Sequence, residues 1–378
     1  MSFKNLKHIA SRNLLNSKGA TIRHKLVVFE SDDWGTIRMS SKKAYADLLK
    51  NYPIDQCHFS KNDMLESNDD LEFLMETLSS VKGADGLPAK FTLNNIMANP
   101  DFEKIRAGDF REYYYEPFVK TLERYPNHDK VLEYYKEGLR TNLFQMQFHG
   151  REHVHVPHWM SALQNGHKTA REIFQYGIVS IFESHETSTC NNEFLNGMAA
   201  YNDKDFEFIS KSVIDGAAMF ESVWGFKSKS VIAPCYNWHP DLEGIFSECG
   251  ISLIQGGKAQ LCPSDAEGVN VPITHFFGEQ NRFKQRYLVR NVHFEPSTNP
   301  SANWIDKALT EIGIAFLWNK PALVSTHRLN FIGGLVQENR DKNLAMLKLL
   351  LEKIIKKWPD VRFISTDELE NYLPSSED

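Results

Sequence analysis

Short runs of apolar and β-branched residues alternate along this chain with longer segments that have a helical period. The candidate strands lie at 25–30, 89–93, 143–147, 178–182, 230–233, 251–254, 322–325 and 362–364. The intervening pattern predicts helices, for example at 205–222, 305–318 and 343–358. In the last of these, Leu344, Leu347, Leu351 and Ile354 recur with the spacing of one helix face. This alternation predicts an α/β protein with a parallel sheet built from βα units.

Seven or eight such units fit a closed or nearly closed barrel better than an open sheet. Two long connections interrupt the pattern, at 97–141 and 255–287. The first contains helical stretches and the second is irregular and rich in glycine and proline. Long loops at one end of a barrel usually shape a binding site. Because we find no repeat and no linker, we expect one domain over residues 1–378 with elaborated loops.

Composition narrows the class of protein. Hydrophobic residues make up 42% of the chain and charged residues 24%, as in globular proteins with a sizeable core. The net charge of -6 gives no basic footprint, so we expect no nucleic-acid partner. The five cysteines are dispersed and form no Cys-x-x-Cys pair, which indicates neither a disulfide framework nor a thiolate zinc site. The sequence shows no signal peptide or membrane span, so we expect a cytoplasmic protein.

Four of the fourteen histidines fall within ten residues, directly after the candidate strand at 143–147. Neutral imidazoles that converge on one place suit zinc or a similar ion. His149 and His153 are four residues apart, so they share a face if one helical turn follows the strand. Pro157 would limit that helix to about one turn. His155 and His158 fit the spacing less well, and we expect supporting, substrate-contacting or surface roles for them.

An acidic pair, Asp32 and Asp33, follows the first candidate strand. Adjacent carboxylates there are costly unless something neutralises one of them. A bound cation would do so and would leave the other carboxylate free to act as a base. An acidic loop that caps the next helix is the alternative. Strand ends converge on one face of a barrel, so two histidines and one aspartate predict a three-ligand catalytic metal site there.

Two later strand ends carry further candidates. His327 follows the strand at 322–325 and could be either a general acid or a hydrogen-bonded core residue. Tyr236 and Trp238 follow the strand at 230–233. These aromatic side chains could stack on a sugar ring, or they could pack the rim of the barrel.

The order of these motifs resembles the polysaccharide deacetylase family of carbohydrate esterases. The matching motifs are Asp32-Asp33, His149-x-x-x-His153, Pro234-Cys235-Tyr236 and Leu323 to His327, and the segment 363–369 looks like the family's last strand and turn. The resemblance implies a distorted (β/α) barrel, commonly of seven strands. It also implies a divalent metal, with zinc as the expected ion, held by Asp33, His149 and His153. Asp32 would then be the catalytic base and His327 the general acid, and a backbone amide near Tyr236 would stabilise the oxyanion.

This chain departs from the family pattern at three places. The family's third motif opens with an arginine that orients the base, and Ala233 stands at that position. The fourth motif, which supports the general acid, has only a candidate by position, from Arg290 to Glu295. Trp34 lies between the acidic pair and Gly35, where the glycine commonly follows directly. With Tyr236 and Trp238, Trp34 is a candidate for substrate contacts.

We therefore expect a metal-dependent hydrolase that removes acetyl groups from an N- or O-acetylated saccharide. In the cytoplasm, its substrate would be a nucleotide- or lipid-linked precursor. One alternative is a glycoside hydrolase that uses two carboxylates from the set Asp32, Glu30, Glu183 and Glu295. The other alternative is a non-catalytic carbohydrate-binding protein that kept the barrel and lost the arginine.

Overall fold

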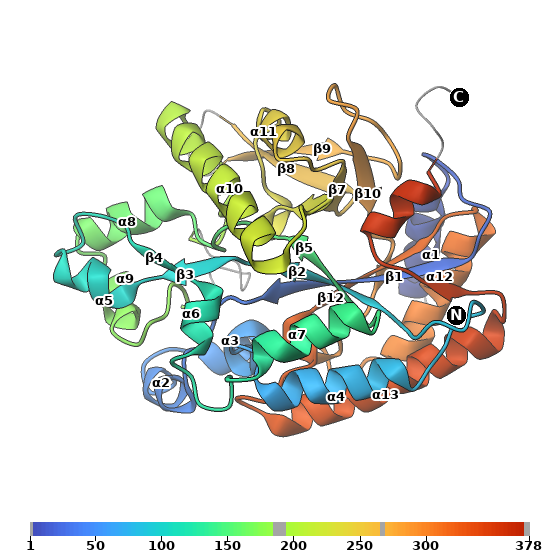
Figure 1. Cartoon of the computed structure of the whole chain (residues 1–378), viewed down its shortest axis with the longest axis horizontal. Helices are drawn as coiled ribbons and strands as arrows, with labels where there is room; N and C mark the ends of the chain where they lie inside the picture. Colours follow the sequence, from blue (N-terminus) through green and yellow to red (C-terminus); the bar gives the residue numbers. More distant parts are fainter. Residues whose placement is uncertain (1–2, 184–193, 265–268, 374–378) are drawn as a thin grey trace.

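The structure is a computed structural model that describes residues 3–183, 194–264 and 269–373. Its centre is a parallel sheet that curls into a distorted barrel surrounded by helices (Figure 1). In spatial order, its main strands are β10 (Arg286–Val289), β7 (Leu253–Gly256), β6 (Ser230–Ile232), β5 (Phe144–Phe148), β2 (Phe91–Asn95), β1 (Leu26–Trp34), β12 (Ala322–His327) and β11 (Val292–His293). A further strand, β13 (Arg362–Phe363), pairs with β1. The α/β barrel expected from the sequence is confirmed.

The two edge strands of this sheet, β10 and β11, are consecutive in the chain and only residues 290 and 291 separate them. The backbone N–H of Arg290 donates to the carbonyl of Gly256 in β7 at 2.9 Å, and the N–H of Asn291 donates to that of Leu323 in β12 at 3.2 Å. One short segment therefore joins both edges. Taken as a single strand, β10 and β11 leave seven positions around the barrel.

Helices cover the outside of the sheet, and Figure 1 shows α4, α7 and α13 side by side along one flank. The α-helices are α1 (Phe3–Asn16), α2 (Lys42–Leu48), α3 (His58–Asn62), α4 (Asn68–Ser79), α5 (Phe102–Ala107), α6 (Phe118–Leu122), α7 (Val131–Arg140), α8 (Val156–Gln164), α9 (Lys168–Phe174), α10 (Asp203–Trp224), α11 (Leu242–Glu248), α12 (Trp304–Leu317) and α13 (Gln337–Lys357). Short 3-10 helices lie at η1 (Ile54–Gln56), η2 (Pro234–Tyr236), η3 (Pro296–Thr298), η4 (Arg328–Asn330) and η5 (Asp367–Asn371).

Two hairpins extend the loops. The strands β3 (Ala98–Pro100) and β4 (Tyr115–Pro117) pair within the first long connection. The strands β8 (Ala259–Pro263) and β9 (Asn270–Thr274) pair within the second. The glycine- and proline-rich pattern of this connection predicted an irregular segment, so the hairpin is an unexpected element.

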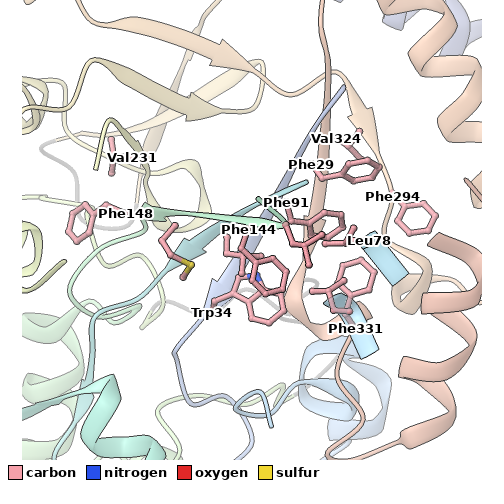
Figure 2. Close-up of a cluster of buried hydrophobic side chains, with 14 of the residues drawn as sticks. Phe29, Trp34, Leu78, Phe91, Phe144, Phe148, Val231, Phe294, Val324 and Phe331 are labelled. Carbon is pink, nitrogen blue, oxygen red and sulfur yellow. The ribbon is translucent and has the colours of Figure 1, made fainter. Parts of the chain in front are cut away.

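Side chains of β1 alternate between two layers, as in any strand. Val27 and Phe29 belong to the large outer core between sheet and helices, whereas Leu26 and Val28 pack with residues of other strands in a smaller cluster. Figure 2 shows the outer core, where Phe29 stacks on Phe91 with ring centroids 4.9 Å apart. Glu30 and Asp32 continue the series of Leu26 and Val28, so β1 carries two acidic side chains toward the inner layer.

Three expectations from the sequence are wrong. Residues 178–182 form no strand, although Ile178, Val179 and Ile181 are buried. Pro157 does not end a helix, because it lies in the first turn of α8, where proline is tolerated. Cys57 is disulfide-bonded, although the dispersed cysteines indicated no disulfide framework. No helix in the described part of the chain is both long and apolar enough to cross a membrane.

Candidate metal and catalytic site

A bulge at the end of β1 brings two neighbouring carboxylates to one site. Adjacent residues of a regular strand point to opposite faces. The pairing of β1 with β2 shifts register between Ser31 and Trp34, and Asp33 has a left-handed backbone with φ of 76°. Such bulges redirect a side chain and are common beside active sites. Here the bulge allows Asp33 to face the same side of the barrel as Asp32.

The two predicted histidine ligands converge through an irregular segment and not through a helical turn. β5 ends at Phe148, and the chain has no helical conformation until Val156. Gly150 turns the chain with φ of 113°, a conformation that side-chain-bearing residues rarely adopt. The rings of His149 and His153 nevertheless lie 5.2 Å apart between centroids. The predicted convergence is correct, and the proposed local structure is wrong.

Asp33, His149 and His153 form a compact buried group with the spacing of metal ligands. Asp33 Oδ1 lies 3.4 Å from Nε2 of each histidine. Donor atoms at about 2.1 Å from a tetrahedral ion would be roughly 3.4 Å apart. Among the described residues, no other group of three or more His, Cys, Asp or Glu side chains is close enough together to hold a metal ion.

The chemistry of the donor atoms also fits a cation. The Nδ1 atom of His149 contacts the carbonyl of Ile232 at 2.8 Å, while its buried Nε2 has no hydrogen-bond partner. This arrangement fixes the ring so that Nε2 can present a lone pair. Burial and the nearby Arg38 hold the pKa of His153 well below its usual range, so this ring is neutral. The three residues therefore offer two imidazoles, of which that of His153 is neutral, and a carboxylate.

Arg38 keeps Asp33 ionised. Burial would raise the pKa of Asp33, but Arg38 and the two histidines hold it well below its usual range. Arg38 donates from Nη2 to Asp33 Oδ2 at 3.1 Å, on the oxygen opposite the one that faces the histidines. Sequence reasoning missed Arg38, whose only local signal is a basic residue five positions after the acidic ligand.

Arg290 brings a guanidinium to both Asp32 and Glu30. Its Nη1 and Nη2 donate to the two carboxylate oxygens of Asp32 at 2.6 and 2.8 Å, and its Nε donates to Glu30 at 2.7 Å. Burial opposes ionisation of Asp32, but Arg290 overcomes it and lowers the pKa of that carboxyl. The guanidinium comes from the junction of β10 and β11, whereas the family motif would place it at Ala233 on the end of β6.

His327 lies beside Asp32 and is held by Glu295. The Nδ1 atom of His327 contacts Glu295 at 2.6 Å, and its Nε2 lies 3.8 Å from Asp32 Oδ2. Burial lowers the pKa of His327, but Glu295 and then the two aspartates outweigh it and raise that pKa to about 9. Asn330 donates to the other oxygen of Glu295 at 2.7 Å. The segment named as the fourth motif by position thus contacts both the base and the acid candidates.

The aromatic candidates are divided between the site and the core. The Tyr236 hydroxyl accepts a hydrogen bond from Arg290 at 3.3 Å, so this side chain borders the site. Trp34 is fully buried in the outer core, and Trp238 is 2% exposed with its indole N–H bonded to Glu243. We therefore do not propose substrate contacts for these two tryptophans. The backbone N–H of Tyr236 donates to the Ala233 carbonyl at 3.0 Å, so the expected oxyanion donor is engaged within η2.

The remaining histidines of the cluster lie outside the metal-ligand group. His155 caps α8 by accepting from the backbone N–H of His158, and its other ring nitrogen lies 2.6 Å from the carbonyl of Ala199. His158 lines a separate pocket.

No protein-family model and no curated protein matches this sequence. Among solved structures, a 4-alpha-glucanotransferase from Thermococcus litoralis has 8% identity and a TM-score of 0.46, over 93% of this chain and 42% of that one. The alpha-amylase AmyC from Thermotoga maritima has 8% identity and a TM-score of 0.45, over 94% and 76%. A probable polysaccharide deacetylase from Pseudomonas aeruginosa PAO1 has 7% identity and a TM-score of 0.44, over 93% and 91%. This chain thus spans about two-fifths of the glucanotransferase, and identities this low assign it no activity.

Proposed function

We propose that this protein is a metal-dependent hydrolase that removes acetyl groups from an N- or O-acetylated saccharide. The observation that carries the proposal is that an ionised carboxylate and a protonated imidazole lie close together beside the metal-ligand group. Arg290 keeps Asp32 ionised, and Glu295 keeps His327 protonated, with 3.8 Å between Asp32 Oδ2 and His327 Nε2. Hydrolysis of an amide or ester requires an ionised base and a protonated acid of this kind.

Asp33, His149 and His153 would hold the metal, for which we propose zinc. A bound divalent ion would polarise the acetyl carbonyl and lower the pKa of a water molecule. Asp32 would accept the proton of the attacking water through Oδ2, which accepts one hydrogen bond from Arg290, whereas Oδ1 accepts from both Arg290 and Asn94. His327 would donate its Nε2 proton to the departing amine or alcohol, while Glu295 keeps the ring oriented through Nδ1.

The positions of the carboxylates do not favour a glycoside hydrolase. Such enzymes need two carboxyl groups that both reach the scissile bond. Glu30 is fully buried and bonded to Arg290, and Glu295 is bonded to His327 and Asn330. Glu183 is exposed and contacts Thr169 at 3.4 Å. Of these four candidate carboxylates, only Asp32 remains beside the metal-ligand group.

The test is to incubate the protein with acetylated oligosaccharides and to measure released acetate and new reducing ends in parallel. We expect acetate without new reducing ends, loss of activity on chelation, and recovery when zinc is added. Reducing ends without acetate would show a glycoside hydrolase instead. Glycan binding with neither product would show a binding protein, and either outcome would overturn the proposal.

The Glu295→Gln variant should move the alkaline limb of the pH–activity profile to lower pH. His327 must be protonated to act as an acid, so wild-type activity should fall as the pH rises through about 9. Loss of the Glu295 charge removes the largest influence that raises this pKa, and the limb should shift by about one to three pH units. Glu338→Gln, in the first turn of α13, is the matched control and should leave the limb in place. An unshifted limb in Glu295→Gln would contradict the role of His327.

A further inference from the structure

A second pocket lies between α5, α9 and the loop after α8, outside the metal-ligand group. It has a volume of about 750 Å³ and is lined by Arg106, Phe110, Gly166, Arg171, Phe174 and Gln175. Figure 1 shows α5, α8 and α9 together at one end of the molecule, away from the layer of α4 and α13. Among the residues at 3–183, 194–264 and 269–373, two arginines and no acidic residue line this pocket.

The guanidinium of Arg171 is fixed by two contacts. Its central carbon lies 3.7 Å from the centroid of the Phe110 ring, and its Nε donates to the carbonyl of Leu163. Phe110 and the preceding Asp109 both have left-handed backbones, with φ of 59° and 52°. Strained conformations of this kind persist where the surroundings hold them, and they cluster at ligand-binding positions. Within the part of the chain that the structure describes, the terminal NH₂ groups of Arg171 have no hydrogen-bond or ion-pair partner.

Arg106 contacts the same aromatic cluster through Phe174. Its guanidinium carbon lies 5.7 Å from the centroid of the Phe174 ring. The rings of Phe174 and Phe110 are in edge-to-face contact, with centroids 5.0 Å apart. Each guanidinium therefore makes a cation–π contact with one of two phenylalanine rings that touch each other, and both arginines line the same pocket.

Both cations lack a carboxylate partner within the described residues, although the chain carries a net charge of -6. Neighbouring basic residues do have partners: Lys104 lies 3.0 Å from Asp101, and Arg111 lies 3.9 Å from Asp109. The missing partners at Arg106 and Arg171 therefore do not reflect a local shortage of acidic residues. Two positive charges with no carboxylate partner among the residues that the structure describes favour an anion as the occupant of this pocket.

We propose that this pocket binds the phosphate group of a small molecule, with the dianion between Arg106 and Arg171. Planar guanidinium groups match phosphate oxygens through paired N–H donors. Two such groups match the two negative charges of a phosphate monoester. The side-chain amide of Gln175 can donate a further hydrogen bond. This site is independent of the proposed hydrolase activity.

Calorimetric titration of the full chain with inorganic phosphate and with glucose 6-phosphate tests the site. We expect Arg106→Gln and Arg171→Gln each to weaken binding by about tenfold or more, because each loses charge-assisted hydrogen bonds. The control is Arg111→Gln, the same change at a side chain that is 81% exposed, and it should bind as the wild type does. Tighter binding of glucose 6-phosphate would identify a phosphorylated metabolite, and equal binding would identify free phosphate.

Two further measurements separate loss of phosphate binding at this pocket from binding at the metal centre and from misfolding. The His149→Ala variant should still bind, which separates this pocket from any phosphate held at the metal centre. Arg106 is exposed, so Arg106→Gln should fold even if Arg171→Gln does not. No binding by the wild type at millimolar phosphate, or an equal loss in Arg111→Gln, would overturn the proposal.

Discussion

Replacement of Asp32 with asparagine should lower the rate of acetate release by about a thousandfold, within the range for loss of a general base. The carboxamide keeps the size of the side chain but cannot accept the proton of the attacking water. The metal content should remain that of the wild type, because Asp33 faces the histidines from its own position in the β1 bulge. Acetate release and metal content should be measured on the same preparation.

The control for this variant is Asp360→Asn, which makes the same exchange at an exposed carboxylate paired with Lys25. It should leave the rate unchanged. Asp32→Asn also deprives buried Arg290 of one of its two acidic partners, so thermal unfolding of the variant must be recorded. A folded Asp32→Asn protein that keeps its metal and more than a tenth of the wild-type rate would contradict the role of Asp32 as the base.

Replacement of either His149 or His153 with alanine should release the bound metal. Each change removes one of three protein donors, and even the loss of a supporting contact typically costs 10–100-fold in metal affinity. We expect a loss of more than about 100-fold, with acetate release falling in proportion to the metal lost. Elemental analysis after dialysis against buffer of defined zinc concentration measures the first quantity directly.

His158→Ala is the matched control for the two histidine variants, because His158 belongs to the same sequence cluster but lines a different pocket. It should retain the metal and the activity. Wild-type metal content in both His149→Ala and His153→Ala would contradict the proposed site, whatever the activity of those variants.

The metal-ligand group could be predicted from the sequence because its members follow strands. Asp33 lies at the end of β1, and His149 comes directly after β5. The carboxyl ends of parallel strands meet at one face of a barrel, so residues far apart in sequence were expected to converge there. The pattern could not show the bulge at Asp33 or the left-handed turn at Gly150, because neither changes the order of polar and apolar residues.

Arg290 and the edge strands could not be predicted in this way. β10 and β11 are four and two residues long, and the polar pair at 290–291 separates them, so no apolar run marks a strand. Trp34 was misjudged because its neighbours in sequence are site residues, whereas the bulge turns its side chain into the outer core. The apolar run at 178–182 buries its side chains without joining a sheet, an ambiguity that periodicity alone does not resolve.

The junction of β10 and β11 makes the mechanical integrity of the barrel and the charge state of Asp32, the proposed base, depend on the same two residues. The amides of Arg290 and Asn291 tie together the edges of the sheet, and the side chain of Arg290 neutralises Asp32. A local opening at this junction would separate Asp32 from Arg290 while the surrounding helices stay folded. Heat inactivation of such a protein would then start as a local event, and activity would be lost before secondary structure.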